Sequence, residues 1–219
     1  MNIENIKKEF PIFDDKIQNN DLVYLDSANS AQKPKMVVDR IYDFYTKEFS
    51  NVGRSVHYLA VAATNLYEET RISVQKYLNA KDKNEIVFTK GATEAINLVA
   101  NTFGQKYLNE GDEVLITELE HHSNYVPWHF LRKAKNIKIK FAEINNDGEI
   151  TLESVKEKIT DKTKIISLTH LSNVTGAVLP IKEIVSLAHS KNIPVLVDGC
   201  RRKNTRLNSS HLLISRMPS

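Results

Sequence analysis

The chain has 219 residues, of which 41% are hydrophobic and 26% are charged. These proportions are typical of a globular protein and exclude a disordered tail or a fibrous repeat. The formal charge of +3 comes from residues 201–219, which hold five of the 30 bases and none of the 27 acids. Basicity therefore gives no reason to expect a nucleic-acid partner.

Apolar runs in this sequence are all too short to span a membrane, and the first ten residues mix acids with bases. The single cysteine, Cys200, excludes an internal disulfide and a CxxC metal site. We therefore expect a cytoplasmic protein that binds neither membrane nor nucleic acid and holds no metal.

Residues 1–58 are predicted to form an N-terminal segment of helices with a short strand over 22–25. Pro34 is expected to open a helix, because apolar residues follow it at helical spacing. A second, longer helix is predicted over 59–78. We assign 59–200 to a second domain, and 201–219 to a tail that does not continue its pattern.

From about residue 85, short apolar runs alternate with amphipathic helical patterns. The predicted strands are 86–88, 114–116, 137–142, 165–168 and 194–197. The predicted helices are 93–108, 124–135, 152–159 and 181–191. Continuous apolar strands are typical of a parallel sheet buried on both faces, so the expected fold class is α/β.

Polar residues follow four of these strands, at the edge where open α/β sheets bind ligands. After 86–88, Gly91 and Thr93 open a helix whose first N–H groups suit a phosphate, although an ordinary capped helix is the alternative. After 114–116, His121 could stack on a flat ligand or make a loop hydrogen bond. Adjacent histidines such as His121 and His122 point apart, which disfavours zinc.

The other two ends carry an amide and an acid. Asn173 follows 165–168 in a segment that could equally be a plain turn. Asp198 ends the last strand, where a buried carboxylate needs a cation, a metal or a protonated ring nitrogen unless it caps a helix. Together the four ends favour a phosphorylated aromatic ligand with a basic ring nitrogen, and pyridoxal 5'-phosphate has these features.

Longer motifs resemble a known family, the SUF-type cysteine desulfurases, which are fold-type I pyridoxal-phosphate enzymes of the class V aminotransferase group. The motifs are YLDSA at 24–28, QKP at 32–34, KGATEAINLVA at 90–100, EHHSNYVPW at 120–128, HLSNVTG at 170–176 and VDG at 197–199. The resemblance runs in order from about Phe10 to Cys200. It implies a three-layer, mostly parallel large domain of the fold-type I transferases, cut before its last strands and its small C-terminal domain.

The resemblance also implies roles for individual residues. Ala92 and Thr93 would hold the cofactor phosphate, and His121 would lie over the pyridine ring. Asn173 would approach the phenolic oxygen, and Asp198 would pair with the ring N–H. His121 and Asp198 are accordingly the predicted catalytic residues.

The implied activity is conversion of L-cysteine to L-alanine, with the sulfur passed as an enzyme persulfide to an acceptor protein of iron-sulfur cluster assembly. The implied assembly is a homodimer. The alternatives are a selenocysteine lyase, another class V enzyme, or a non-catalytic module that binds a phosphorylated ligand. A dinucleotide-binding module is disfavoured because no GxGxxG occurs.

Three departures from the family pattern stand out. Gly53 lies where the family often has a histidine, and Arg201 lies where it has a glutamine that assists the phenolic oxygen. The lysine that should bind the cofactor covalently is missing, because the only lysine after Asp198 is Lys203, which is too close. Cys200 is expected to be a small buried residue and not the nucleophile.

These departures lead us to expect an N-terminal fragment joined to a non-native tail at 201–219. Such a fragment would lack the cofactor-linking lysine and the nucleophilic cysteine, so we expect it to be inactive alone. Its uncovered strand edges would make it prone to aggregate.

Overall fold

The computed structural model describes residues 3–27 and 30–200, so the predicted tail lies outside the described residues. The chain divides into two compact units, Met1–Val74 and Gln75–Ser219. The domain boundaries predicted at residues 58 and 200 stay predictions.

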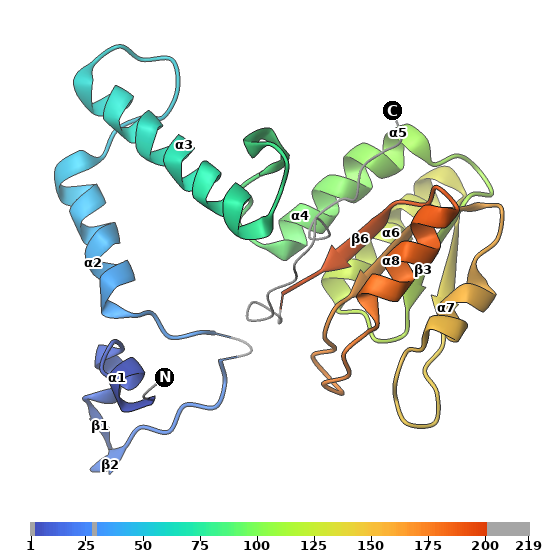
Figure 1. The fold of residues 1–219 in the computed structure, drawn as a ribbon, viewed down its shortest axis with the longest axis horizontal. Helices are drawn as coiled ribbons and strands as arrows, with labels where there is room; N and C mark the ends of the chain where they lie inside the picture. Colours follow the sequence, from blue (N-terminus) through green and yellow to red (C-terminus); the bar gives the residue numbers. More distant parts are fainter. Residues whose placement is uncertain (1–2, 28–29, 201–219) are drawn as a thin grey trace. The chain divides into compact units, whose positions relative to one another are not determined.

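The first unit consists of short elements and part of one long helix (Figure 1). In chain order they are α1 (Ile3–Lys7), η1 (Pro11–Phe13), β1 (Lys16–Ile17), β2 (Asn20–Asp21), α2 (Lys35–Asp43), η2 (Phe44–Glu48) and the start of α3 (Tyr58–Leu78). The helix expected after Pro34 is confirmed as α2, and the helix expected over 59–78 is confirmed as α3.

The strand predicted over 22–25 is wrong, because the β1–β2 hairpin ends at Asp21. Gln18 and Asn19 both have positive φ, of 53° and 67°, as a tight two-residue hairpin turn requires. Beyond the hairpin, Leu25 is 90% exposed and does not pack as its apolar character suggests.

The second unit is built around a four-stranded sheet. Its elements after α3 are η3 (Lys83–Glu85), α4 (Ala92–Val99), η4 (Ala100–Gly104), α5 (Gln105–Tyr107), β3 (Glu113–Thr117), α6 (His122–Lys135), β4 (Lys138–Ala142), α7 (Leu152–Lys158), β5 (Thr163–Thr169), α8 (Ile181–Ser190) and β6 (Val195–Asp198). The strand order is β4-β3-β5-β6, and every pairing is parallel. The predicted α/β class is confirmed.

Helices cover both faces of this sheet, giving three layers. Leu115, Ile166 and Val197 pack with Ile184 of α8 on one face. Val114, Ile116 and Leu196 pack with α4 and α6 on the other face, in a cluster that includes Ile96, Val99, Trp128 and Leu131. The alternation along β3 and β6 follows from the two-residue period of a strand. In Figure 1, α8 lies in front of the sheet.

The strand predicted over 86–88 is wrong, because the structure assigns no strand there. Ile86 is buried, but Val87 is 62% exposed and Phe88 is also exposed. An apolar run indicates that a segment tends to be buried. It does not indicate that a neighbouring strand is present for it to pair with.

In the described part of the chain, no helix has both the length and the apolar character needed to cross a membrane.

Candidate functional site

Two helices, α4 and α6, begin at the edge of the sheet where its strands end. α6 starts at His122, five residues after β3 ends at Thr117. Near the opposite edge, the Lys135 ammonium at the end of α6 donates to the carbonyl oxygen of Gln105 (2.5 Å). Gln105 lies 13 residues after the start of α4 and Lys135 lies 13 residues after the start of α6, so the two N-termini lie at the same end of this layer.

The N-terminus of α4 presents backbone donors. The first hydrogen bond of the helix runs from the N–H of Ala95 to the carbonyl of Gly91 (3.1 Å). The N–H groups of Ala92 and Thr93 precede it, so the helix itself does not use them. A Cβ added at Gly91 would meet nothing within 4 Å, and Thr93 is exposed. This end of α4 is therefore open and carries the positive end of the helix dipole.

His121 is the N-cap of α6. Its Nδ1 accepts from the N–H of Ser123 (3.2 Å) and lies 2.6 Å from the Ser123 hydroxyl. The ring is exposed at the edge of the sheet. The contacts of Nδ1 with Ser123 hold the orientation of the imidazole.

Asp198 is the last residue of β6 and is 7% exposed. It lies two residues after Leu196, so its side chain points to the face that α4 and α6 cover. One carboxylate oxygen accepts from the N–H of Cys200 (3.0 Å). Cys200 itself is exposed, so the expectation that it is a small buried residue is wrong, because the chain leaves the sheet at Gly199.

Asn173 lies in the loop that follows β5, at the same edge of the sheet, and it is exposed. The loop is closed by hydrogen bonds from the N–H groups of Val174 and Thr175 to the hydroxyl of Ser172 (3.2 and 3.3 Å). Gly176 has a φ of +74°, which allows the chain to turn back. The loop is thus held by Ser172, and the Asn173 side chain is left at its surface.

The side chain that joins these strand ends is Glu120. One of its carboxylate oxygens accepts from the Thr117 hydroxyl (2.6 Å) and from the N–H of Thr169 (2.9 Å). The other accepts from the side-chain amide of Asn124 (2.6 Å). Glu120 therefore connects the ends of β3 and β5 with the first turn of α6.

Asn124 is fully buried and continues this network into the core. Its carbonyl oxygen accepts from the Ser167 hydroxyl (2.5 Å) and from the indole N–H of Trp128 (3.4 Å). Every hydrogen-bonding atom of the Asn124 amide group thus has a protein partner, as a polar group at this depth requires.

Burial raises the pKa of the Glu120 carboxyl from 4.5 to about 7. The negative charge of Asp198 adds to this rise, whereas hydrogen bonds from Thr117, Thr169 and Asn124 oppose it. Two carboxyl groups on neighbouring parts of the sheet edge therefore affect one another.

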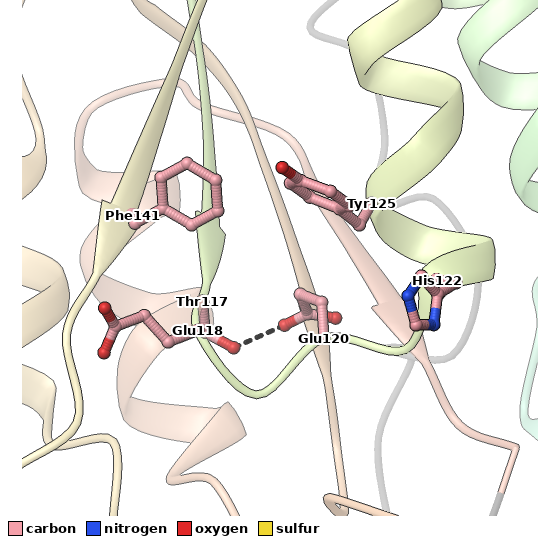
Figure 2. A pocket seen from close by; sticks show the side chains of 6 residues that line it. All are labelled: Thr117, Glu118, Glu120, His122, Tyr125 and Phe141. Carbon is pink, nitrogen blue, oxygen red and sulfur yellow. Dashed lines mark hydrogen bonds between the residues drawn. The ribbon is translucent and has the colours of Figure 1, made fainter.

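A pocket of about 380 Å³ opens beside this network, at the ends of β3 and β4 (Figure 2). It is lined by Thr117, Glu118, Glu120, His122, Tyr125 and Phe141. The predicted residues Ala92, Thr93, His121, Asn173 and Asp198 do not line it. Of the side chains described so far at this edge, the pocket shares Thr117 and Glu120.

The structure places all the predicted site residues at one edge of the sheet. Thr93, His121 and Asp198 belong to the face covered by α4 and α6, and Asn173 lies in the loop after β5. Glu120, Asn124 and Ser167 were not predicted from the sequence. One signal was present, since an acid and an amide four residues apart at a helix start can meet on one side of the helix.

Comparisons with known proteins agree on one family. The family model described as Aminotransferase class-V matches residues 23–205. A probable cysteine desulfurase of Halalkalibacterium halodurans is 44% identical over 201 residues, which are 92% of this chain and 50% of that protein.

Two solved structures with the same fold are cysteine desulfurases. The apo structure of the enzyme from Thermococcus onnurineus NA1 superposes with a TM-score of 0.81 at 33% identity, covering 90% of this chain and 47% of that one. The enzyme CsdA from Escherichia coli gives a TM-score of 0.78 at 36% identity, covering 91% and 49%. The chain spans about half the length of the relatives it matches.

Proposed function

Because the chain belongs to the class-V aminotransferase family, we propose that the protein is a pyridoxal-phosphate-dependent cysteine desulfurase. The observation that carries the proposal is the position of Asp198. Its buried carboxylate ends β6 on the same face, and at the same edge, as the open N-terminus of α4. An acid and an anion-binding helix end are the two anchors that this cofactor needs.

The residues present fit the cofactor. The N–H groups of Ala92 and Thr93, with the Thr93 hydroxyl, would bind its phosphate. Asp198 would hold a proton on the ring nitrogen, His121 would lie against the ring, and Asn173 would donate to the phenolic oxygen. When bound, pyridoxal phosphate supplies an electron sink for the charge left when a bond to the substrate Cα breaks.

The substrate that we propose is L-cysteine, which the enzyme converts to L-alanine while its sulfur passes as a persulfide to an acceptor protein of iron-sulfur assembly. Curated relatives described as cysteine desulfurases support this, as does a structural neighbour, SspA, that was solved in complex with cysteine at 28% identity and a TM-score of 0.74. We place the protein in the cytoplasm as a homodimer, in agreement with the single cysteine and with the family resemblance.

The test uses the complete protein, with the cofactor-linking lysine that residues 1–219 lack. Asp198→Asn is compared with Asp147→Asn, a matched control in an exposed turn. We expect the unchanged protein to bind pyridoxal phosphate with visible absorption that borohydride makes permanent, and to release alanine from cysteine. Asp198→Asn should lower alanine formation about a hundredfold, the scale on which one preorganised electrostatic contact acts. Alanine formation equal to that of Asp147→Asn, or no cofactor binding by the unchanged protein, would refute the proposal.

A further inference from the structure

Glu120 has no role in the proposed function, yet its side chain is hydrogen-bonded to three residues at this edge of the sheet. Its two carboxylate oxygens accept three hydrogen bonds, from Thr117 at the end of β3, Thr169 at the end of β5 and Asn124 in α6. His121 is its neighbour in sequence and caps α6. The carboxyl group therefore holds the loop that carries His121 against two strand ends.

The far end of this connection is rigid. Asn124 is fixed by the hydroxyl of Ser167 and the indole of Trp128, and all three side chains are fully buried. Because the Asn124 amide is held in place, the Glu120 carboxylate that binds it has little freedom to move. The core of the domain therefore sets the position of Glu120.

Glu120 also acts on Asp198. Thr169, whose N–H donates to Glu120, pairs in register with Asp198, and the next N–H, of His170, donates to the carbonyl of Asp198 (2.9 Å). The charge of Asp198 helps to raise the pKa of Glu120 to about 7. The interaction is mutual, so ionisation of Glu120 must affect a positive group held by Asp198.

We propose that Glu120 is a positioning residue of the cofactor site, which fixes the loop bearing His121 to the strand that pairs with Asp198 and adds a second negative charge beside that acid. This inference rests on the proposed function, because Asp198 and His121 are its cofactor contacts. In this role Glu120 acts through Asp198 and His121 and is not itself a cofactor contact.

The charge part of the proposal predicts a dependence on pH. The titratable groups near Glu120 include Asp198 on β6, His170 after β5, Glu118 and His121 on its own loop, and His122 and Tyr125 on α6. At pH 8.5 Glu120 is mostly ionised and would favour a protonated ring nitrogen held by Asp198, whereas at pH 6 it is mostly neutral.

The first experiment measures the dissociation constant of pyridoxal phosphate for the complete protein at pH 6 and pH 8.5. The variants are Glu120→Gln, which keeps an acceptor oxygen but removes the charge, and Glu153→Gln, which removes an exposed charge from α7. We expect the loss of affinity in Glu120→Gln, relative to Glu153→Gln, to grow about tenfold between the two pH values, the scale of one pKa unit of interaction. An equal loss at both pH values would overturn the proposal.

The second experiment needs no cofactor. In the apoprotein at pH 8.5, where Glu120 is mostly ionised, hydrogen exchange at the Thr169 amide should be about tenfold faster in Glu120→Ala than in Glu153→Gln, because a bond to a charged acceptor is lost. The amide of Ile166, which donates to the carbonyl of Pro194 (3.0 Å), is the internal reference. If Glu120→Ala does not fold, Glu120→Gln is compared with the unchanged protein, and a smaller acceleration at Thr169 is expected.

The two experiments separate this inference from the proposed function. If no form of the protein binds pyridoxal phosphate, the proposed function fails, and the Thr169 amide still decides whether Glu120 holds the loop. Unchanged exchange at Thr169 in the Glu120 variants would overturn the positioning role even in a protein that binds the cofactor well.

Discussion

Glu120 is held by hydrogen bonds that favour its ionised form, yet burial outweighs them and raises its pKa from 4.5 to about 7. The folded protein therefore binds this proton more tightly than the unfolded chain does. Between about pH 4.5 and pH 7 the unfolded chain has lost the proton and the folded protein still holds it, so the free energy of unfolding falls as the pH rises. The loss is complete above the folded-state pKa.

We expect this single carboxyl to lower the free energy of unfolding by on the order of 3 kcal/mol between pH 4.5 and pH 8. Urea unfolding of the unchanged protein and of Glu120→Gln at both pH values measures it, because titrating groups that do not interact with Glu120 cancel in the difference. Glu153→Gln should show the same pH dependence as the unchanged protein. Parallel pH profiles for Glu120→Gln and the unchanged protein would show that Glu120 titrates normally.

Some residues of the candidate site were selected from the sequence, and others became apparent only in the structure. Asp198 and His121 were visible because each follows a buried apolar run, and such positions gather at one edge of a parallel sheet. The hydrogen-bond partners of Glu120 and Asn124 were not visible in the sequence, because Thr169 lies 49 residues from Glu120 and Ser167 lies 43 residues from Asn124. Hydrogen bonds over such separations are set by strand register, which local patterns do not contain.

At the scale of elements, the sequence predicted helices more reliably than strands. The helix expected over 93–108 is observed as three consecutive segments, α4, η4 and α5, and the one expected over 124–135 begins two residues earlier at His122. Four apolar runs became strands because each lies beside another such run. The runs at 86–88 and 22–25 did not become strands. A strand needs a neighbouring strand to pair with, and the residues of one run do not show whether that neighbour is present.

Close packing of the α4–α5 segment on α6 depends on Gly104. A Cβ added there would lie 2.5 Å from Leu131 Cδ2 and 3.7 Å from Trp128 Cζ3. Leu131 is itself buried against Trp128 and has little room to move. We therefore expect Gly104→Ala to lower the free energy of unfolding by about 1–2 kcal/mol, because overpacking outweighs the better helix propensity of alanine.

The matched control lies at the other end of the same helical segment. Gly91 has an extended backbone and open space around it, so Gly91→Ala should lower the free energy of unfolding only by the weaker N-cap preference of alanine, below about 1 kcal/mol and less than Gly104→Ala does. Urea unfolding of both variants makes the comparison. Equal stability of the two variants would show that Leu131 can move aside and that Gly104 is not required for packing.

At the scale of the whole molecule, the two units differ in how much apolar surface they bury. Both hydrophobic clusters lie in the second unit, between Ile96 and Val197. Among the described residues of the first unit, the buried hydrophobic residues are Ala60 and Ala63, both on α3. Several apolar side chains of α2 are exposed, including Val38, Ile41 and Tyr42. The burial that resists local opening is thus concentrated in the sheet and its helices.

This contrast predicts how backbone amides exchange with deuterium in the 219-residue chain. Amides in the middle of β3 and β5, such as that of Ile166, lie in a sheet covered on both faces, so they should exchange only when the second unit unfolds. Amides of α2 lack a buried apolar face in this chain, so they should exchange by local opening at least about a hundredfold faster. Mass spectrometry of peptides from 35–43 and 163–169 measures both rates in one sample, with the peptide from 59–74 of α3 as an intermediate case. Equal protection of α2 and β5 would contradict this prediction and would mean that contacts other than a buried apolar face stabilise the first unit. If α2 protection then rises with protein concentration, those contacts are between copies of the chain.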